Sequence, residues 1–299
     1  MLVVVGAALL AGCGRDAGGA AKARLRVGST NFTEQLILAE LYAQALEANG
    51  YLVQRRLSLG TREIVAPALQ AGELDLCPEY LATFLAYITK DTSQATGDAA
   101  AAYRALEAAA RPKGLTPLAY APAVDTNGYV VTKETAAKYQ LARLSDLRPV
   151  AGQLVLGGPP ECPSRPFCLP GLQEKYGITF KEFKALDAGG PLTVAALDSK
   201  QIDVAVLFTT DPIIAAKGYV LLDDDRELEL ADNILPIVRS EVLTISGRAL
   251  ETLLDAVSAK LTTADLMALN RKVGLEKQDP KPVAAEWLKQ KGIVKSPSS

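Results

Sequence analysis

The sequence offers few residues for acid–base chemistry, because its 299 residues include no histidine. Histidine is the commonest general base near neutral pH and the commonest zinc ligand. Ser-His-Asp and Cys-His enzymes are therefore excluded. Carboxylate pairs such as Glu79 with Asp211 remain available to a hydrolase, but the composition favours binding over catalysis.

The four cysteines point to export. Cys162 and Cys168 flank a proline-containing loop of five residues, which an oxidising compartment would close into a disulfide ring. Metal binding is the alternative, but two thiols without histidine do not complete a tetrahedral zinc site. We expect no metal and no cofactor. Cys77, at the end of an apolar run, is interpreted as a small buried side chain.

A turn rich in hydrogen-bonding groups follows the first predicted strand. Residues 25–29 alternate as a strand, and Asn31, Phe32 and Thr33 then lead into an amphipathic helix that stops at Asn49. Free backbone N–H groups at a helix N-terminus favour an anion or a carbonyl. The turn is a candidate ligand contact, or alternatively a helix cap alone.

The elements that would position these residues form two α/β blocks. Alternating strands and helices predict parallel sheets covered by helices, with ligands at the carboxyl ends of the strands. We expect strands over residues 51–57, 74–77, 128–132, 153–156, 182–185 and 204–208, and helices over 61–71, 95–113, 169–176 and 191–199. Residues 121–127 and 232–238 are the predicted crossings between lobes, and a helical last third should pack on the first lobe.

The N-terminal segment resembles the signal of a lipoprotein. Residues 1–12 are almost wholly apolar and end in Leu-Ala-Gly before Cys13, after which residues 14–24 are small and polar. A signal peptidase would cleave there, and Cys13 would then carry lipid. The apolar run is shorter than the roughly 20 residues that span a bilayer, so it is not interpreted as a transmembrane helix. A buried N-terminal strand is the alternative. The expected location is extracytoplasmic and membrane-anchored.

Size and charge narrow the partners. A chain of 299 residues with 49% hydrophobic residues buries enough core for two lobes. A net charge of −2, with both signs interspersed, lacks the concentrated basic surface that nucleic acid requires. We therefore expect no nucleic-acid partner.

Three stretches resemble one known family. Residues 29–35 (STNFTEQ), 72–80 (GELDLCPEY) and 208–211 (FTTD) are similar to signature stretches of the glycine betaine, choline and osmoprotectant solute-binding proteins of ABC importers. The resemblance runs from about residue 25 to about residue 293. The cysteine loop is more similar to an actinobacterial branch of that family.

The resemblance implies a fold, partners and a location. It implies an α/β, two-lobed clamshell of the type II periplasmic-binding-protein class, with two inter-lobe crossings and closure around a small solute. The expected lobes are residues 25–122 with 234–299, and residues 123–233. The partners would be a small-molecule solute and the permease and ATPase subunits of an importer, with the chain acting as a monomer and not as an enzyme.

The resemblance also implies a binding site. Family members hold quaternary ammonium in a cage of aromatic faces, and Tyr80 and Phe208 stand at two such positions. Two other aromatic positions of the family are polar here, at Asn127 and at Asp232 or Asn233. Arg165 is the first candidate partner for a ligand carboxylate, and Arg62 is the second. The predicted ligand contacts are Ser29, Asn31, Phe32, Thr33, Thr61, Tyr80, Thr83, Asp125, Asn127, Arg165, Phe208, Thr209, Asp232 and Asn233.

The polar residues in the predicted site leave the identity of the solute undecided. Each cation–π contact contributes about 0.5–2 kcal/mol, so two missing faces would weaken betaine binding. A quaternary amine such as glycine betaine or choline is the main hypothesis, and a different polar or phenolic solute on the same fold is the alternative. A secreted hydrolase acting through carboxylates and a sensory binding module are the competing functions from other classes.

Overall fold

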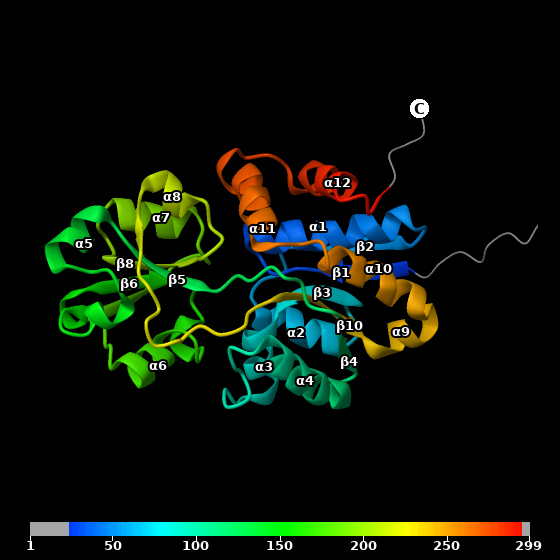
Figure 1. The fold of residues 1–299 in the computed structure, drawn as a ribbon, viewed down its shortest axis with the longest axis horizontal. Coiled ribbons are helices and arrows are strands. Elements are labelled where there is room, and N and C mark those ends of the chain that lie inside the picture. Colours follow the sequence, from blue (N-terminus) through cyan, green and yellow to red (C-terminus); the bar gives the residue numbers. More distant parts are fainter. Residues whose placement is uncertain (1–23, 295–299) are drawn as a thin grey trace, which may run out of the picture.

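The computed structural model describes residues 24–294, which form two lobes side by side (Figure 1). Each lobe is built on a five-stranded sheet. The first sheet has the order β2-β1-β3-β10-β4 and comprises β1 (Arg24–Gly28), β2 (Leu52–Arg56), β3 (Leu76–Tyr80), β10 (Ile234–Arg239) and β4 (Leu115–Pro117). The second has the order β7-β6-β8-β5-β9 and comprises β5 (Asn127–Val131), β6 (Val155–Gly158), β7 (Glu182–Ala185), β8 (Val204–Phe208) and β9 (Val220–Leu221).

Helices cover both sheets, as the predicted α/β class requires (Figure 1). The first lobe carries α1 (Thr33–Ala48), α2 (Arg62–Gln70), α3 (Leu81–Thr89), α4 (Ala99–Ala110), α9 (Ser240–Ser246), α10 (Arg248–Ser258), α11 (Thr263–Asn270) and α12 (Pro280–Gln290). The second carries α5 (Lys133–Tyr139), α6 (Leu169–Gly171), α7 (Pro191–Asp198) and α8 (Ile213–Lys217). No helix within residues 24–294 has the length and apolar character needed to cross a bilayer.

The sheets are mixed and not parallel throughout, which corrects the prediction. β1 pairs in parallel with β2 and β3, and β6 with β7 and β8. β10 runs antiparallel to β3 and β4, and β5 runs antiparallel to β8 and β9. The parallel pattern holds within strand–helix–strand units. It fails at β5 and β10, because these strands receive the chain from the opposite lobe.

Two crossing segments run beside each other between the lobes (Figure 1). Val124 pairs with Asn233 in an antiparallel bridge, and the Asp125 backbone N–H donates to the Asp232 carbonyl. The crossing predicted over residues 232–238 is wrong in its second half, because residues 234–239 form β10. That strand is apolar and pairs on both sides within the first sheet, so the return crossing precedes it.

The first-lobe core surrounds α1. Ile37, Leu41 and Leu46 of this helix are fully buried. On one side α1 meets β1 and β3, and on the other α10, α11 and α12 pack against it. The prediction that the last third returns to the first lobe is confirmed. These contacts fix the N-terminus of α1, and with it the turn at Asn31 and Phe32, at the face toward the second lobe.

One helix at the site was absent from the prediction. α3 begins directly after β3, and its Leu81, Phe84 and Leu85 are fully buried. A short and almost wholly apolar run directly after a buried strand cannot be told from a continuing strand by its pattern alone. Its placement brings Thr83 and Tyr87 to the space between the lobes.

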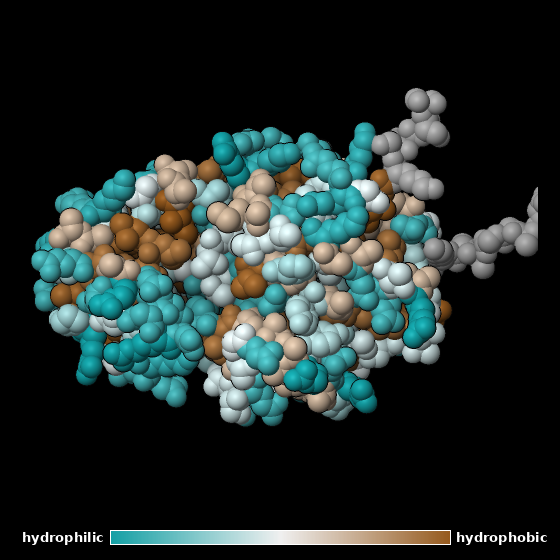
Figure 2. All heavy atoms as spheres, viewed as in Figure 1, coloured by the Kyte–Doolittle hydropathy of each residue, from teal (hydrophilic) through white to brown (hydrophobic). Residues whose placement is uncertain are grey.

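The surface is mixed in character. Figure 2 shows hydrophilic residues over much of both lobes, with hydrophobic residues gathered on the second lobe in the region of α7. Leu192 at the start of α7 is 64% exposed. The larger apolar surfaces are nevertheless internal, in one core for each face of each sheet.

Candidate functional site

A cavity of about 390 Å³ lies between the two lobes. That volume suits a small solute, since sites for small molecules typically span roughly 300–1,000 Å³. The wall is formed by the turn after β1, the starts of α2 and α3, both crossings and the cysteine loop. Of the predicted contacts, Asn31, Phe32, Thr61, Tyr80, Thr83, Asp125, Asn127, Arg165, Phe208 and Asp232 line it.

Three aromatic rings form a stack that spans the gap between the lobes. Phe32 precedes α1, and its ring centroid lies 4.8 Å from that of Phe208 at the end of β8, with 24° between the ring planes. Phe32 also faces Tyr80 at 6.2 Å and 23°. Tyr87 and Phe167 add two further aromatic side chains to the cavity wall. Aromatic faces attract cations through their quadrupole, so the wall suits a positively charged group.

A buried ion pair stands at the floor of the first lobe. The Arg62 Nη2 lies 2.7 Å from a Glu79 carboxylate oxygen, and its Nε donates to both oxygens at 3.0 Å. Arg62 also donates to the Thr83 hydroxyl at 2.9 Å. Both charged side chains are at most 9% exposed. Removing one partner of a desolvated pair leaves the other charge uncompensated, so the two depend on each other.

Asp232, on the return crossing, accepts from the backbone N–H of Thr83 at 2.9 Å and from its hydroxyl at 3.3 Å. Burial raises the pKa of Asp232 to about 6, assisted by the charge of Glu79 and opposed by the Thr83 hydrogen bonds and by Arg62. The carboxylate is ionised at neutral pH, and a bound cation would favour that form.

A second buried carboxylate cluster joins the two lobes. Thr210 donates through its hydroxyl to Glu34 at 2.6 Å and through its backbone N–H to Asp125 at 3.0 Å. Tyr80 and Asn270 also donate to Glu34, at 2.8 Å and 2.7 Å. Burial, with the charge of Glu34, raises the pKa of Asp125, and burial raises that of Glu34. Within residues 24–294 no lysine or arginine forms an ion pair with either carboxylate.

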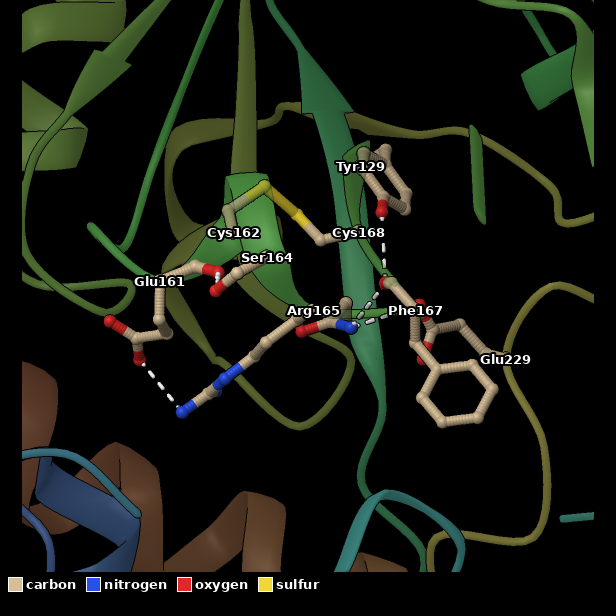
Figure 3. The surroundings of a disulfide bond; sticks show 9 residues. Tyr129, Glu161, Cys162, Ser164, Arg165, Phe167, Cys168 and Glu229 are labelled. Atoms are coloured by element: carbon tan, nitrogen blue, oxygen red, sulfur yellow. Dashed lines mark hydrogen bonds and ion pairs between the residues drawn. A yellow bond between two sulfur atoms is a disulfide. The ribbon is translucent and has the colours of Figure 1, made fainter. Parts of the chain in front are cut away.

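The cysteine loop borders the cavity from the second lobe (Figure 3). Cys162 and Cys168 form the predicted disulfide, with their Cα atoms 5.2 Å apart. Between them, Arg165 pairs with Glu161 at 3.0 Å and reaches across to Glu63 of α2 at 3.1 Å. Arg165 is therefore an inter-lobe contact whose guanidinium already has two carboxylate partners.

Asn127 forms hydrogen bonds that fix the position of the cysteine loop. Its amide nitrogen donates to the Phe167 carbonyl at 3.0 Å and to Glu229 at 2.9 Å. The Tyr129 hydroxyl donates to the same carbonyl at 3.2 Å (Figure 3). The polar replacement noticed at Asn127 thus has a local structural role, which is to fix Phe167 at the cavity wall.

Four predicted contacts lie outside the lining of this cavity. Ser29 donates to the Thr30 carbonyl and accepts from the Ser58 N–H, while Asn233 donates to the Ala121 carbonyl. Their polar groups are used by neighbouring backbone and hold the turn and the crossing. The other two are Thr209, whose hydroxyl donates to Asp125, and Thr33, which lines a neighbouring cavity beside the Phe32–Phe208 stack.

Several residues that line the cavity were not among the predicted ligand contacts. Gln35, Glu79, Tyr87 and Phe167 belong to this group. Tyr87 follows Thr83 by four positions on α3, and residues four apart share a helix face. A helix predicted directly after Tyr80 would have revealed it. The sequence contains no local pattern that signals Phe167.

The chain matches one known family over most of its length. Residues 23–290 match the OpuAC family, the substrate-binding domain of ABC-type glycine betaine transport systems. The chain belongs to this family. It is thus a substrate-binding protein of an ABC importer, and not an enzyme. The family acts outside the cytoplasm and delivers small solutes to a permease driven by an ATPase.

Individual relatives are named for the same kind of protein as the family. A glycine-betaine-binding protein of Pseudomonas aeruginosa is 31% identical, with 95% of this chain and 94% of that protein covered. The glycine betaine-binding protein YehZ of Escherichia coli is 30% identical, covering 91% and 92%. The solved structure of a glycine betaine/carnitine/choline ABC transporter protein matches with a TM-score of 0.70 at 25% identity, covering 91% of this chain and 100% of that one. The type II periplasmic-binding-protein fold is thereby confirmed, whereas the actinobacterial branch stays a prediction.

Replacing both Cys162 and Cys168 by serine is expected to lower the free energy of unfolding by about 2 kcal/mol, since a ring this short restricts the unfolded chain modestly. Urea denaturation of the two proteins measures the difference. Cys77→Ser is the control that removes a thiol without a bridge. Equal stability of the oxidised parent and the double variant would contradict a stabilising disulfide.

Proposed function

We propose that the solute delivered by this substrate-binding protein is a small quaternary amine of the glycine betaine or choline class. The observation that carries the proposal is the group of aromatic side chains on the cavity wall, led by Phe32, Tyr80 and Phe208. A quaternary ammonium has no hydrogen to donate, so aromatic faces and nearby carboxylates are its best partners. Relatives named for glycine betaine and carnitine support the class.

The proposed contacts combine both lobes. Tyr80, Phe32 and Phe208 would face the ammonium, and Asp232 would balance its charge, with Asp125 beside it on the wall. Polar groups of Asn31, Thr61 and Thr83 would meet the remainder of the solute. Ser29, Thr33, Thr209 and Asn233 would position these contacts.

The protein is further proposed to be a monomer that is lipid-anchored through Cys13 and has no nucleic-acid partner. Cys13 and the linker at residues 14–24 fall almost wholly outside the described residues. Support comes from the Leu-Ala-Gly-Cys pattern, the family's extracytoplasmic role and a net charge of −2. Labelling of cells with a fatty-acid probe, followed by Cys13→Ser, tests the anchor, because only the parent should carry the label.

Titration calorimetry on protein that begins after Cys13 tests which class of solute binds. Choline, glycine betaine, carnitine, polyols and phenolic solutes form the panel, and we expect quaternary amines alone to bind with saturation. Ligand binding also adds RT ln(1 + [L]/Kd) to stability, so a thermal shift gives an independent measure. Saturable binding of a polyol or a phenol, with none of any quaternary amine, would refute the proposal.

Affinity for a cationic solute is expected to fall by about fourfold between pH 7.5 and pH 5.5. Burial raises the pKa of Asp232 to about 6, so acidification protonates it and removes a negative charge from the wall. Calorimetry across this range measures the effect. Asp232→Asn should bind more weakly at pH 7.5 and lose most of the pH dependence; an unchanged profile would contradict the role of Asp232.

A further inference from the structure

The charged side chains facing the cavity do not balance. Carboxylates outnumber basic groups, five to three. They are Glu63, Glu79, Asp125, Glu161 and Asp232, against Arg62, Lys90 and Arg165. How these groups pair decides which charge a ligand meets on entering.

The first arginine uses its Nε and Nη2 for Glu79, so a ligand carboxylate would have to share the guanidinium with that buried partner. Arg62 holds Glu79 with two nitrogen atoms and Thr83 with one of them. Both charges are buried. For a ligand carboxylate to take the place of Glu79, that side chain would lose its counter-charge in a desolvated position, which is strongly unfavourable.

The second arginine is engaged as well. Arg165 lies between Glu161 at 3.0 Å and Glu63 at 3.1 Å, and Figure 3 shows its side chain extended toward Glu161. Burial opposes ionisation of Glu63, but hydrogen bonds from Thr61 and Arg165 and the charge of Arg165 lower its pKa to about 2. Both partners of Arg165 therefore surround it with negative charge.

The remaining basic group is peripheral. Lys90, which follows α3, is exposed, and its ammonium lies 4.0 Å above the Tyr87 ring. Water screens an exposed charge of this kind. In contrast, Asp125 and Asp232 are 3% and 4% exposed and have no ion pair within residues 24–294.

We propose that this cavity selects a quaternary amine that carries a net positive charge and a hydroxyl group, as choline does, over zwitterionic amines that carry a carboxylate. The inference rests on the proposed function and narrows it. The ammonium adds a counter-charge beside Asp232. A hydroxyl can donate to this carboxylate, whereas a ligand carboxylate meets a wall whose arginines are already paired.

Calorimetry with choline and glycine betaine at pH 7.5 tests the inference. We expect choline to bind at least tenfold more tightly. Equal affinities, or tighter binding of betaine, would overturn the selectivity and leave the quaternary-amine proposal standing. Binding of neither compound, with saturable binding of an uncharged solute, would overturn both.

A single substitution tests the cause of the selectivity. Glu161→Gln removes one partner of Arg165, so it should tighten betaine binding by threefold or more and leave choline unimproved. Glu174→Gln is the matched control, because Glu174 is exposed on the same lobe and lies away from the cavity. A betaine-to-choline affinity ratio in Glu161→Gln equal to that of the control would overturn the explanation by paired arginines.

Discussion

Replacing Tyr80 by alanine is expected to weaken binding of a quaternary amine by about ten- to a hundredfold. Tyr80 is 7% exposed, and its ring faces both the cavity and Phe32. The substitution removes one aromatic face and the hydroxyl that donates to Glu34 at 2.8 Å. A cation–π contact contributes about 0.5 kcal/mol when exposed and about 2 kcal/mol or more when desolvated, as in this cavity, which corresponds to the expected loss of affinity. Calorimetry with choline measures the loss.

Tyr80→Phe separates the two contributions. It keeps the aromatic face and removes the hydroxyl alone, so we expect affinity within about threefold of the parent. The unfolding temperature without ligand shows whether either variant alters the fold. Unchanged affinity in Tyr80→Ala would place Tyr80 outside the binding site. Equal losses in the two variants would assign the effect to the hydroxyl and contradict the aromatic contact.

Arg62→Met should lower the free energy of unfolding by about 3–5 kcal/mol, because it leaves the Glu79 carboxylate buried without a counter-charge. Methionine keeps much of the arginine volume, so a cavity contributes little to the effect. The Arg62 hydrogen bond to Thr83 is lost too. Urea denaturation without ligand measures the change, since Arg62 also lines the cavity and binding would confound it.

Two comparisons make this result specific. Lys200→Met breaks the exposed pair with Glu134, whose side chains are 66% and 72% exposed, and should cost less than about 1 kcal/mol. The double variant Arg62→Met with Glu79→Gln removes both buried charges and should recover part of the lost stability. A loss in Arg62→Met no larger than in Lys200→Met would show that the buried pair does not stabilise the fold.

Most local elements and their alternation could be predicted from the amino-acid sequence. Strands over residues 182–185 and 204–208 have the predicted bounds, because each is a short run bounded by turn-forming residues. The disulfide was also predictable, since the prolines and the short span between Cys162 and Cys168 bring the thiols together. α3 was not predicted, because a short and almost wholly apolar run directly after a buried strand cannot be told from a continuing strand by its pattern alone.

The three aromatic positions were predictable only with the family resemblance. Phe32, Tyr80 and Phe208 follow or end separate strands, and nothing local distinguishes them from core residues. Phe32 meets Tyr80 within the first lobe, and its contact with Phe208 depends on bringing the two lobes together across the crossings.

The pairing of the charged side chains depends on the tertiary structure. Arg165 and Arg62 were predicted as partners for a ligand carboxylate, yet Arg165 meets Glu63, 102 positions away, and Arg62 meets Glu79. Glu34 likewise finds Thr210 and Asn270 at separations of 176 and 236 residues. A sequence shows which side chains are charged, but their partners depend on which surfaces the folded lobes present to each other. That arrangement turns two candidate carboxylate-binding arginines into paired ones and places Asp125 and Asp232 among the side chains that line the cavity.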